Sequence, residues 1–149
     1  MAERMNNFNG KEWLQHSFTI WREIKKTQEE NKLKHPAMFP SALAEKLINI
    51  YTKDNGEVIL DPFLGVGSTL IAAKKLAKRG IGIDLNPEYL KIAKNRIEEC
   101  KCEINNSNPE DYSSNILLGD SRKVLKKIED VQKVDMKEYF KFIDEKYAK

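Results

Sequence analysis

The chain has 149 residues, which is the length of one domain and enough to bury a core without disulfide or metal staples. Its 40% hydrophobic and 33% charged residues are typical of a soluble globular protein, and its net charge of +3 permits contact with nucleic acid without arguing for it. No apolar run approaches the length of a membrane span and the N-terminus lacks the apolar core of a signal peptide, so we expect a cytoplasmic protein with no membrane contact.

The N-terminal residues 9–31 place aromatic and aliphatic side chains among many charges. Trp13, Ile20, Trp21 and Ile24 lie near one face at helical spacing. We therefore expect residues 1–33 to form a helical docking segment. Its apolar face would pack either on the chain's own core or on another molecule.

From residue 40 onward, helical and strand patterns alternate along the chain. The expected helices cover residues 41–51, 68–79, 87–100 and 121–130, with Gly80 ending the second, and the expected strands cover 57–60, 81–84 and 115–120. Residues 103–114 are polar and loop-like, and after Val131 a short strand and a terminal helix, 137–149, are the best match. Alternation of this kind predicts a doubly wound α/β fold with a parallel sheet and right-handed crossovers. We expect a single domain, with a core at 34–130 and a divergent C-terminal segment at 131–149.

Two cysteines, Cys100 and Cys102, are too close in sequence for an ordinary structural disulfide. A C-x-C pair without a second pair is a weak metal signal, so we expect reduced thiols and no metal site.

The stretch DPFLGVGST, residues 61–69, joins the first strand to the following helix, where the ligands of such folds bind. Gly65 and Gly67 would let the backbone approach a ligand with no Cβ in the way, and the helix that follows would offer free N–H groups. A nucleotide triphosphate loop would need Gly-Lys-Ser/Thr, which is absent. A dinucleotide loop would need a small residue where Leu70 stands, and Asp61 would sit beside its pyrophosphate. S-adenosylmethionine, an adenosine that carries an amino acid, removes that conflict.

Acidic residues stand at the ends of all three strands, namely Asp61, Asp84 and Asp120, the last followed by Ser121. Asp84 is placed to accept hydrogen bonds from both ribose hydroxyls of an adenosine, and Asp120 with Ser121 to meet the adenine edge. Acids after strands also cap helices, and for Asp120 and Ser121 capping is an equal alternative.

The stretch DPFLGVGST resembles the D-P-F-x-G-S-G-T motif of the DNA amino-methyltransferases, with Val66 in place of the usual serine. GIGIDLNPEYLKIAKNRI is similar to that family's next strand and helix, and KHPAMFP to the segment that closes over the methionine end of the cofactor. The resemblance covers about residues 34–100 and implies a Rossmann-like methyltransferase fold that binds S-adenosylmethionine. With the strand-end acids, it gives the following cofactor-binding residues: His35, Pro36, Phe39, Asp61, Pro62, Phe63, Gly65, Gly67, Ser68, Thr69, Asp84, Leu85, Asp120 and Ser121. For His35 a surface position before proline is an equal alternative, and for Phe39 a place in the core.

The family's acceptor motif, [DNS]-P-P-[YFW], is missing, since the chain has no Pro-Pro dipeptide. Asn86–Tyr89 and Asn108–Asp111 are the nearest strings, and neither has the second proline. We therefore expect an incomplete methyltransferase fold that lacks the segment after its fourth strand, and no catalytic residue in this chain.

The first functional hypothesis is the cofactor-binding part of a DNA adenine-N6 or cytosine-N4 methyltransferase. A second chain or a missing segment would then supply catalysis and DNA recognition, so a hetero- or homo-oligomer is possible. The alternatives are an inactive regulatory module or remnant that keeps the cofactor pocket and, more weakly, a methyltransferase for RNA or a small molecule.

Overall fold

The computed structural model describes residues 6–17, 20–33, 35–53, 57–101 and 114–128. Its centre is a three-stranded parallel sheet in the order β1-β2-β3, made of β1 (Val58–Asp61), β2 (Arg79–Asp84) and β3 (Ser114–Leu118). The register places Asp61 level with Gly82, and Asp84 level with Leu118. The expected parallel α/β sheet is therefore confirmed, with strand bounds that differ from the expected ones by one or two residues.

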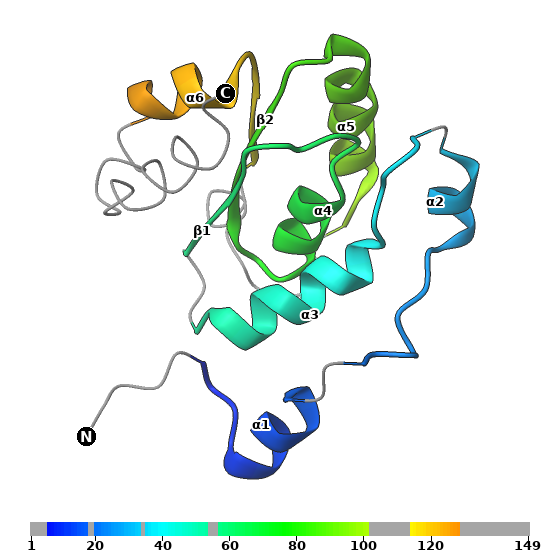
Figure 1. Cartoon of the computed structure of the whole chain (residues 1–149), viewed down its shortest axis with the longest axis vertical. Helices are drawn as coiled ribbons and strands as arrows, with labels where there is room; N and C mark the ends of the chain where they lie inside the picture. The colour runs from blue at the N-terminus through cyan, green and yellow to red at the C-terminus, as the bar shows by residue number, and fades with distance from the viewer. Residues whose placement is uncertain (1–5, 18–19, 34, 54–56, 102–113, 129–149) are drawn as a thin grey trace, which may run out of the picture.

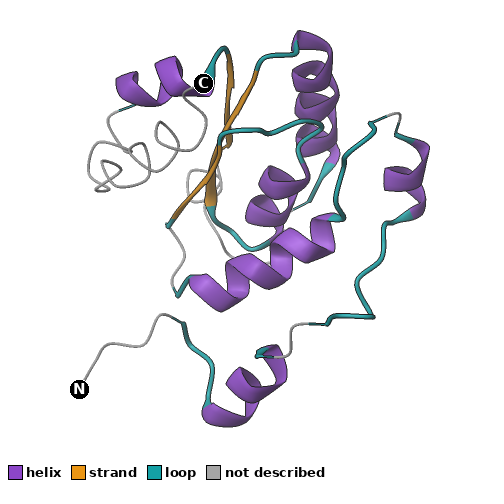
Figure 2. Cartoon of the chain, in the orientation of Figure 1, coloured by secondary structure: helices purple, strands orange, loops and turns teal. Residues whose placement is uncertain are grey.

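Helices cover both faces of this sheet (Figure 1). The helices α4 (Ser68–Lys75) and α5 (Pro87–Glu99) lie on one face, while α6 (Ser121–Val124) lies on the other. The helix α3 (Ser41–Tyr51) packs against α4, with Ala44 and Ile48 buried against Ala72 and Ala73. Figure 2 shows the same arrangement by element type, and it is the doubly wound architecture that the alternating pattern predicts.

Two leucines of the core pack against β2 at positions where the strand has glycine. Leu70 is fully buried, and a Cβ on Gly80 would lie 2.8 Å from its Cγ. A Cβ on Gly82 would lie 2.6 Å from a methyl carbon of Leu64. A dinucleotide loop achieves close packing of helix and strand with a glycine on the helix, at the position that Leu70 occupies here. In this chain the glycines are on the strand instead, so the helix and the strand pack closely with Leu70 in place.

One expected boundary is wrong, because Gly80 lies inside β2 and does not end the preceding helix. The helix α4 ends at Lys75, and Ala77 takes a positive φ of 51° in the turn that follows. The sequence KKLAKR is helical in composition, but the pairing of Arg79 with Val58 draws this end of the segment into the sheet.

The N-terminal segment is not one helix as its apolar spacing predicts. It forms α1 (Gly10–His16) and α2 (Gln28–Lys32), and the described residues between them are irregular. The segment runs past α3 in Figure 1 and contacts that helix at two points. Asn6 donates from Nδ2 to the carbonyl of Ile50 at 2.6 Å, and the Nζ of Lys46 lies 4.7 Å from the ring centroid of Trp21.

The helix expected at 121–130 is shorter, since α6 ends at Val124 and a 3-10 turn, Leu125–Lys127, follows. Leu125 is buried with Ile83 on the face of the sheet that α6 covers. The polar loop expected at 103–114 lies outside the described residues except for Ser114, which begins β3, and the segment expected at 131–149 lies wholly outside them. None of the helices in the described ranges is long and apolar enough to cross a membrane.

Candidate functional site

Asp61, the last residue of β1, organises the start of the glycine stretch. Its Oδ1 accepts a hydrogen bond from the N–H of Phe63 at 2.9 Å, and its Oδ2 accepts one from the hydroxyl of Thr69 at 2.5 Å. These two bonds tie the first residue of the loop to the beginning of α4. Asp61 is half-buried, and the loop curves around its carboxylate.

Asp84, the last residue of β2, holds the middle of the same loop. Its Oδ2 accepts a hydrogen bond from the N–H of Gly65 at 2.7 Å, and its Oδ1 accepts one from the N–H of Asn86 at 2.8 Å. The N–H of Leu64 also donates to the carbonyl of Ile83 at 2.9 Å. The structure therefore brings the two predicted acids Asp61 and Asp84 onto one loop.

Asp120 is the N-cap residue of α6, and its carboxylate contacts Arg122. Its Oδ1 accepts from the N–H of Arg122 at 3.0 Å, and its Oδ2 pairs with the Arg122 guanidinium at 2.7 Å. Hydrogen bonds from that guanidinium hold the pKa of Asp120 below its ordinary value. Ser121 is buried at the first position of α6. The contacts of Asp120 are those of a helix cap, which is one of the two alternatives that the sequence leaves open for this residue.

The two loop glycines have different surroundings. Both are buried and take positive φ, 54° at Gly65 and 89° at Gly67. A Cβ on Gly65 would lie 3.2 Å from Nε2 of His35, whereas one on Gly67 would lie 3.0 Å from the Cβ of Ala93 in α5. The expectation that a side chain at either glycine would enter ligand space is therefore wrong for Gly67, where the added atoms would meet the neighbouring helix.

The predicted residues before α3 reach the loop from the other side. His35 lies beside Gly65 and meets the ring of Tyr89 with centroids 4.5 Å apart, while its Nδ1 accepts from the N–H of Ala37 at 3.3 Å. The hydroxyl of the buried Ser68 donates to the carbonyl of Phe39 at 3.0 Å. The KHPAMFP segment and the glycine stretch are thus joined. His35 is half-buried between them and is not the free surface side chain of the alternative interpretation.

Large apolar side chains near this loop are open to solvent. Phe63 and Leu85 follow the ends of β1 and β2 and are 72% and 71% exposed, and Leu118 at the end of β3 is 60% exposed. Phe39 is 41% exposed, so it is not a core residue, and Pro36 is exposed while Pro62 is half-buried. An apolar rim at the carboxyl ends of the strands offers stacking surface to a flat ligand.

The start of α4 also has unused hydrogen-bond donors. Among the described residues, no acceptor meets the N–H groups of Val66, Ser68, Thr69 or Leu70. Such groups together with the positive end of a helix dipole favour a carboxylate or another anion.

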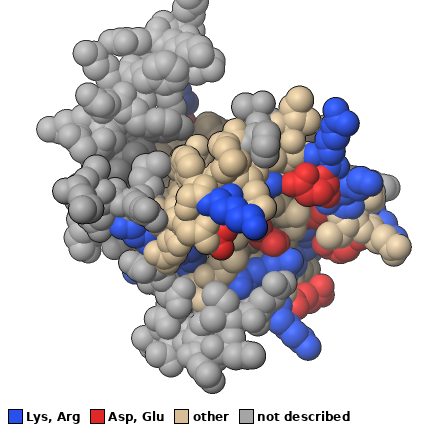
Figure 3. All heavy atoms as spheres, turned by 90° about the horizontal axis from the view of Figure 1, so that it is seen from below, with Lys and Arg blue, Asp and Glu red and all other residues tan. Residues whose placement is uncertain are grey.

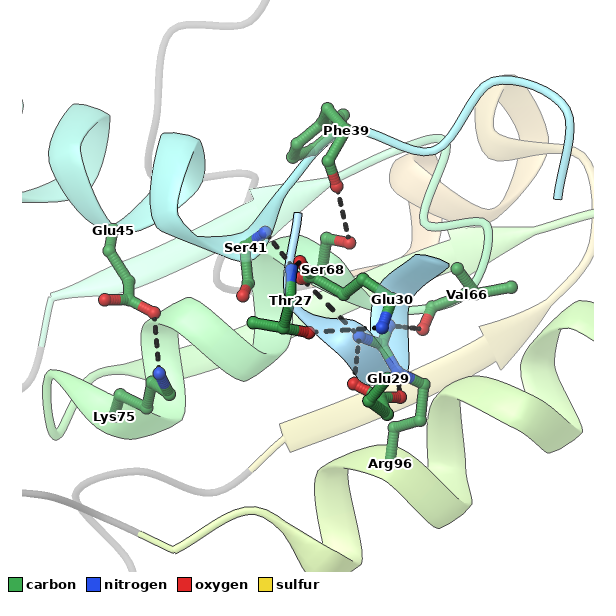
Figure 4. Close-up of polar contacts among 10 residues, drawn as sticks. All are labelled: Thr27, Glu29, Glu30, Phe39, Ser41, Glu45, Val66, Ser68, Lys75 and Arg96. Carbon is green, nitrogen blue, oxygen red and sulfur yellow. Dashed lines mark hydrogen bonds and ion pairs between the residues drawn. The ribbon is translucent and has the colours of Figure 1, made fainter. Parts of the chain in front are cut away.

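A buried ionic network that the sequence interpretation missed lies behind the loop (Figure 4). Arg96 of α5 is 8% exposed and donates to Glu29 at 2.7 Å and to the carbonyl of Val66 at 2.6 Å. Glu30, 2% exposed, accepts from the N–H groups of Ser41 and Thr27, each at 2.8 Å. Glu30 thereby caps α3, whose own N-cap residue, Pro40, has no side-chain donor or acceptor. Two signals in the sequence mark these residues, namely the spacing of Arg96 on the buried stripe of Ala93 and Ile97, and the capping-box pattern Thr27-x-x-Glu30.

We expect the stability of the chain to fall at acid pH through Glu30. Burial alone would raise the pKa of Glu30, but the N–H groups of Ser41 and Thr27 and the charge of Arg96 outweigh it and hold the pKa below its ordinary value of 4.5. A lowered folded-state pKa contributes stability that is present above pH 4.5 and is lost as the pH falls through the folded value.

Replacing Glu30 with glutamine should cost on the order of 2 kcal/mol at pH 7, because charge-assisted hydrogen bonds to backbone are lost. Urea unfolding at pH 7 and pH 4 measures both effects. The variant should show a smaller loss between the two pH values than the unmodified chain. An equal loss in both proteins would remove Glu30 as the acid-sensitive group.

A cavity of about 260 Å³ lies on the side of this network, away from the strand-end rim. It is lined by Thr27, Glu29, Ser41, Ile71, Lys75, Arg96, Glu99 and Cys100. Arg96 already pairs with Glu29, and Lys75 pairs with Glu45 at 3.0 Å. We interpret this cavity as the junction between α2 and the core, not as the cofactor site.

Comparison with known proteins identifies the family of the chain. The sequence profile of the N6/N4 methyltransferase family, described as DNA methylase, matches residues 2–95. The type II methyltransferase M2.DpnII of Streptococcus pneumoniae is 52% identical over 65 residues, which are 44% of this chain and 24% of that protein. The type II methyltransferase M2.LlaDCHI of Lactococcus lactis subsp. cremoris is 40% identical over 97 residues, 65% of this chain and 35% of that protein.

A solved structure agrees with these relatives. The protein TTHA0409 of Thermus thermophilus, described as a putative DNA modification methylase and complexed with S-adenosyl-L-methionine, superposes with a TM-score of 0.52 at 30% identity, covering 76% of this chain and 39% of that one. The chain thus spans 24% to 39% of the length of these proteins. The glycine loop, the parallel sheet and the family match lead to one conclusion: the chain belongs to the N6/N4 family of DNA methylases.

Proposed function

We propose that the chain binds S-adenosylmethionine at the carboxyl ends of its strands, as the cofactor part of a DNA amino-methyltransferase. The observation that supports this most directly is the glycine loop. Asp61 and Asp84 hold it, while the first N–H groups of α4 meet no acceptor in the part of the chain that the structure describes. The relative that was solved with S-adenosyl-L-methionine supports the identity of the ligand.

In this proposal each part of the cofactor meets a different group of residues. Asp84 accepts from the ribose hydroxyls, since each of its oxygens has a second lone pair beyond the backbone bond that it already accepts. The exposed Phe63 and Leu85 flank the adenine, and Asp120 with Ser121 lies near its edge. The ammonium faces Asp61, and the carboxylate faces the start of α4 with Ser68 and Thr69. His35, Pro36, Phe39, Pro62 and Gly65 complete the walls, and Gly67 shapes the loop by allowing its close approach to Ala93 of α5.

The domain division follows from the same assignment. Residues 34–130 form the cofactor core, residues 1–33 fasten to it, and residues 131–149 diverge from the family. The contacts of Asn6 and Trp21 with α3 and of Glu29 with Arg96 support docking of the N-terminal segment on its own chain.

The target base is held elsewhere in this proposal. The sequence lacks Pro-Pro, so no [DNS]-P-P-[YFW] motif is available to hold and stack a flipped base. On the face in Figure 3, basic and acidic side chains lie next to one another instead of forming one basic surface. DNA recognition and the acceptor motif then come from a second chain or from a further segment of the same protein.

Calorimetric titration tests the cofactor site. S-adenosylhomocysteine, which lacks the reactive methyl, should bind saturably with one site per chain. NAD should neither bind nor compete, because the carboxylate of Asp61 at the loop entrance would repel the negative charges of its pyrophosphate. Failure of S-adenosylhomocysteine to bind the folded chain would contradict the proposal.

A methyl-transfer assay tests the missing acceptor site. The chain alone should transfer no tritiated methyl to unmethylated duplex DNA, because misplacing the attacking amine alone costs on the order of a hundredfold in rate. The same assay should be repeated with any adjacent gene product that contains the acceptor motif. Transfer by the chain alone would show that an acceptor site is present in it. Inactivity in both assays, together with cofactor binding, would favour a regulatory module.

A further inference from the structure

We infer that Arg96 is a positioning residue for the cofactor loop: its guanidinium fixes the orientation of the Val66 peptide and so keeps the loop in its binding conformation. Arg96 lies on α5 and meets the loop from behind, so in this assignment it touches no cofactor atom (Figure 4). The inference rests on the proposed cofactor site and adds a residue that shapes it.

All three nitrogens of the Arg96 guanidinium donate hydrogen bonds. Nη1 donates to the Val66 carbonyl at 2.6 Å, while Nε and Nη2 donate to the two carboxylate oxygens of Glu29 at 2.7 and 3.2 Å. Nη2 also lies 3.7 Å from Oε1 of the buried Glu30. A lysine has a single ammonium and cannot reproduce this fork.

The Val66 carbonyl is at the point where the loop needs a fixed orientation. It lies between two glycines with positive φ, and glycine peptides rotate more freely than others. The N–H on the far side of this peptide, that of Gly67, donates to the carbonyl of Leu64 at 3.1 Å. The peptide is therefore held at both ends, by Arg96 on its carbonyl and by Leu64 on its N–H.

Loss of the Arg96 contact would leave a buried carbonyl without a donor, since Val66 is 2% exposed. The peptide would then sample other orientations, and the population of the binding-competent loop would fall. Affinity falls in proportion to that population. The N–H groups of Val66 and Ser68, which we assign to the cofactor site, belong to the peptides on either side and would move with it.

The test compares Arg96→Lys with a matched control, Lys74→Met. Lys74 donates from Nζ to the carbonyl of Ile97 at 2.6 Å, a cation-to-carbonyl contact between α4 and α5 that is not at the glycine loop. Both variants should lower the melting temperature. Only Arg96→Lys should weaken S-adenosylhomocysteine binding, by about tenfold, and only it should move the Gly67 amide resonance in the ligand-free ¹H–¹⁵N spectrum.

Glu29→Gln adds a second comparison. Glu29 is 59% exposed in its side chain, and its replacement leaves the contact from Arg96 to Val66 in place. We expect its affinity to stay within about twofold of the unmodified chain, because the loop carbonyl keeps its donor. If Arg96→Lys does not fold, Arg96→Met, which removes every N–H donor together with the buried charge, replaces it with the same measurements.

Affinity within about twofold of the unmodified chain for Arg96→Lys, with an unchanged Gly67 resonance, would overturn the inference. An equal loss of affinity in Lys74→Met would overturn it too, because the effect would then be one of general stability. If the unmodified chain binds no S-adenosylhomocysteine, the proposed function fails, while the Gly67 resonance still reports whether Arg96 sets the loop.

Discussion

Replacing Gly67 with valine is expected to destabilise the folded chain by about 2–5 kcal/mol, the sum of a left-handed backbone penalty and overpacking. The φ of 89° at this position disfavours any side chain, and most strongly a β-branched one. A Cβ here would lie 3.0 Å from the Cβ and 3.2 Å from the Cα of Ala93, so it would push α5 away from the loop. Urea unfolding measures the loss directly.

Gly65→Ala is the matched control for this variant. Its φ of 54° is close to the left-handed minimum, and the atoms nearest to its Cβ would be those of the His35 ring, a side chain that can move. We expect a loss of about 1–2 kcal/mol. If Gly67→Val were as stable as Gly65→Ala, the close approach of α4 and α5 at Gly67 would not be a requirement of the fold.

Replacing Asp84 with alanine is expected to weaken S-adenosylhomocysteine binding by about 1–3 kcal/mol, through loss of charge-assisted hydrogen bonds to the ribose. The same change frees the N–H of the buried Gly65, which donates to Asp84 at 2.7 Å, so some stability will be lost as well. Calorimetry on the folded variant, with unfolding measured separately, distinguishes the two effects.

Asp120→Ala is the comparison for Asp84→Ala at the next strand end. Arg122 already pairs with the Asp120 carboxylate, so its loss should reduce affinity less than the loss of Asp84. Unchanged affinity in folded Asp84→Ala would remove Asp84 from the site. A larger effect at Asp120 would move the ribose assignment to β3.

Much of the architecture follows from local patterns that the sequence displays. The helix at Pro87–Glu99 begins at the Asn86 cap and keeps Leu90, Ala93 and Ile97 on its buried face, as the spacing predicts. The strand-end acids Asp61 and Asp84 hold the same loop because parallel strands place their carboxyl ends at the same edge of the sheet. The first feature depends on the spacing and capping of one helix, and the second on the rule that strands joined by a helix pair in parallel.

The errors arise where distant segments decide the outcome. Gly80 resembles a helix terminator, but β2 needs it there because Leu70 occupies the space where its Cβ would lie. The apolar residues at 13–24 have helical spacing, yet the helix ends at His16. Trp21 then packs under Lys46 of α3. Neither the Leu70 contact nor the Lys46 contact is visible from spacing along the chain.

The buried network at Arg96 shows the same limit for the site. Glu29 and Glu30 lie far before Arg96 in the sequence, and only folding places them around one guanidinium. Charged residues of this kind normally belong to the solvated surface, so a buried position is not the expectation from composition. The loop motif could be identified from the sequence, whereas the contacts that hold it could not.

A ¹H–¹⁵N titration of the labelled chain with S-adenosylhomocysteine tests the central claim most directly, because it locates the ligand. We predict shifts at the amides of residues 63–69 and 84–86, with little change at Thr27, Ser41 and Cys100 beside the cavity of α2. Saturable shifts centred on those cavity residues, or none at the glycine loop, would contradict binding at the strand ends.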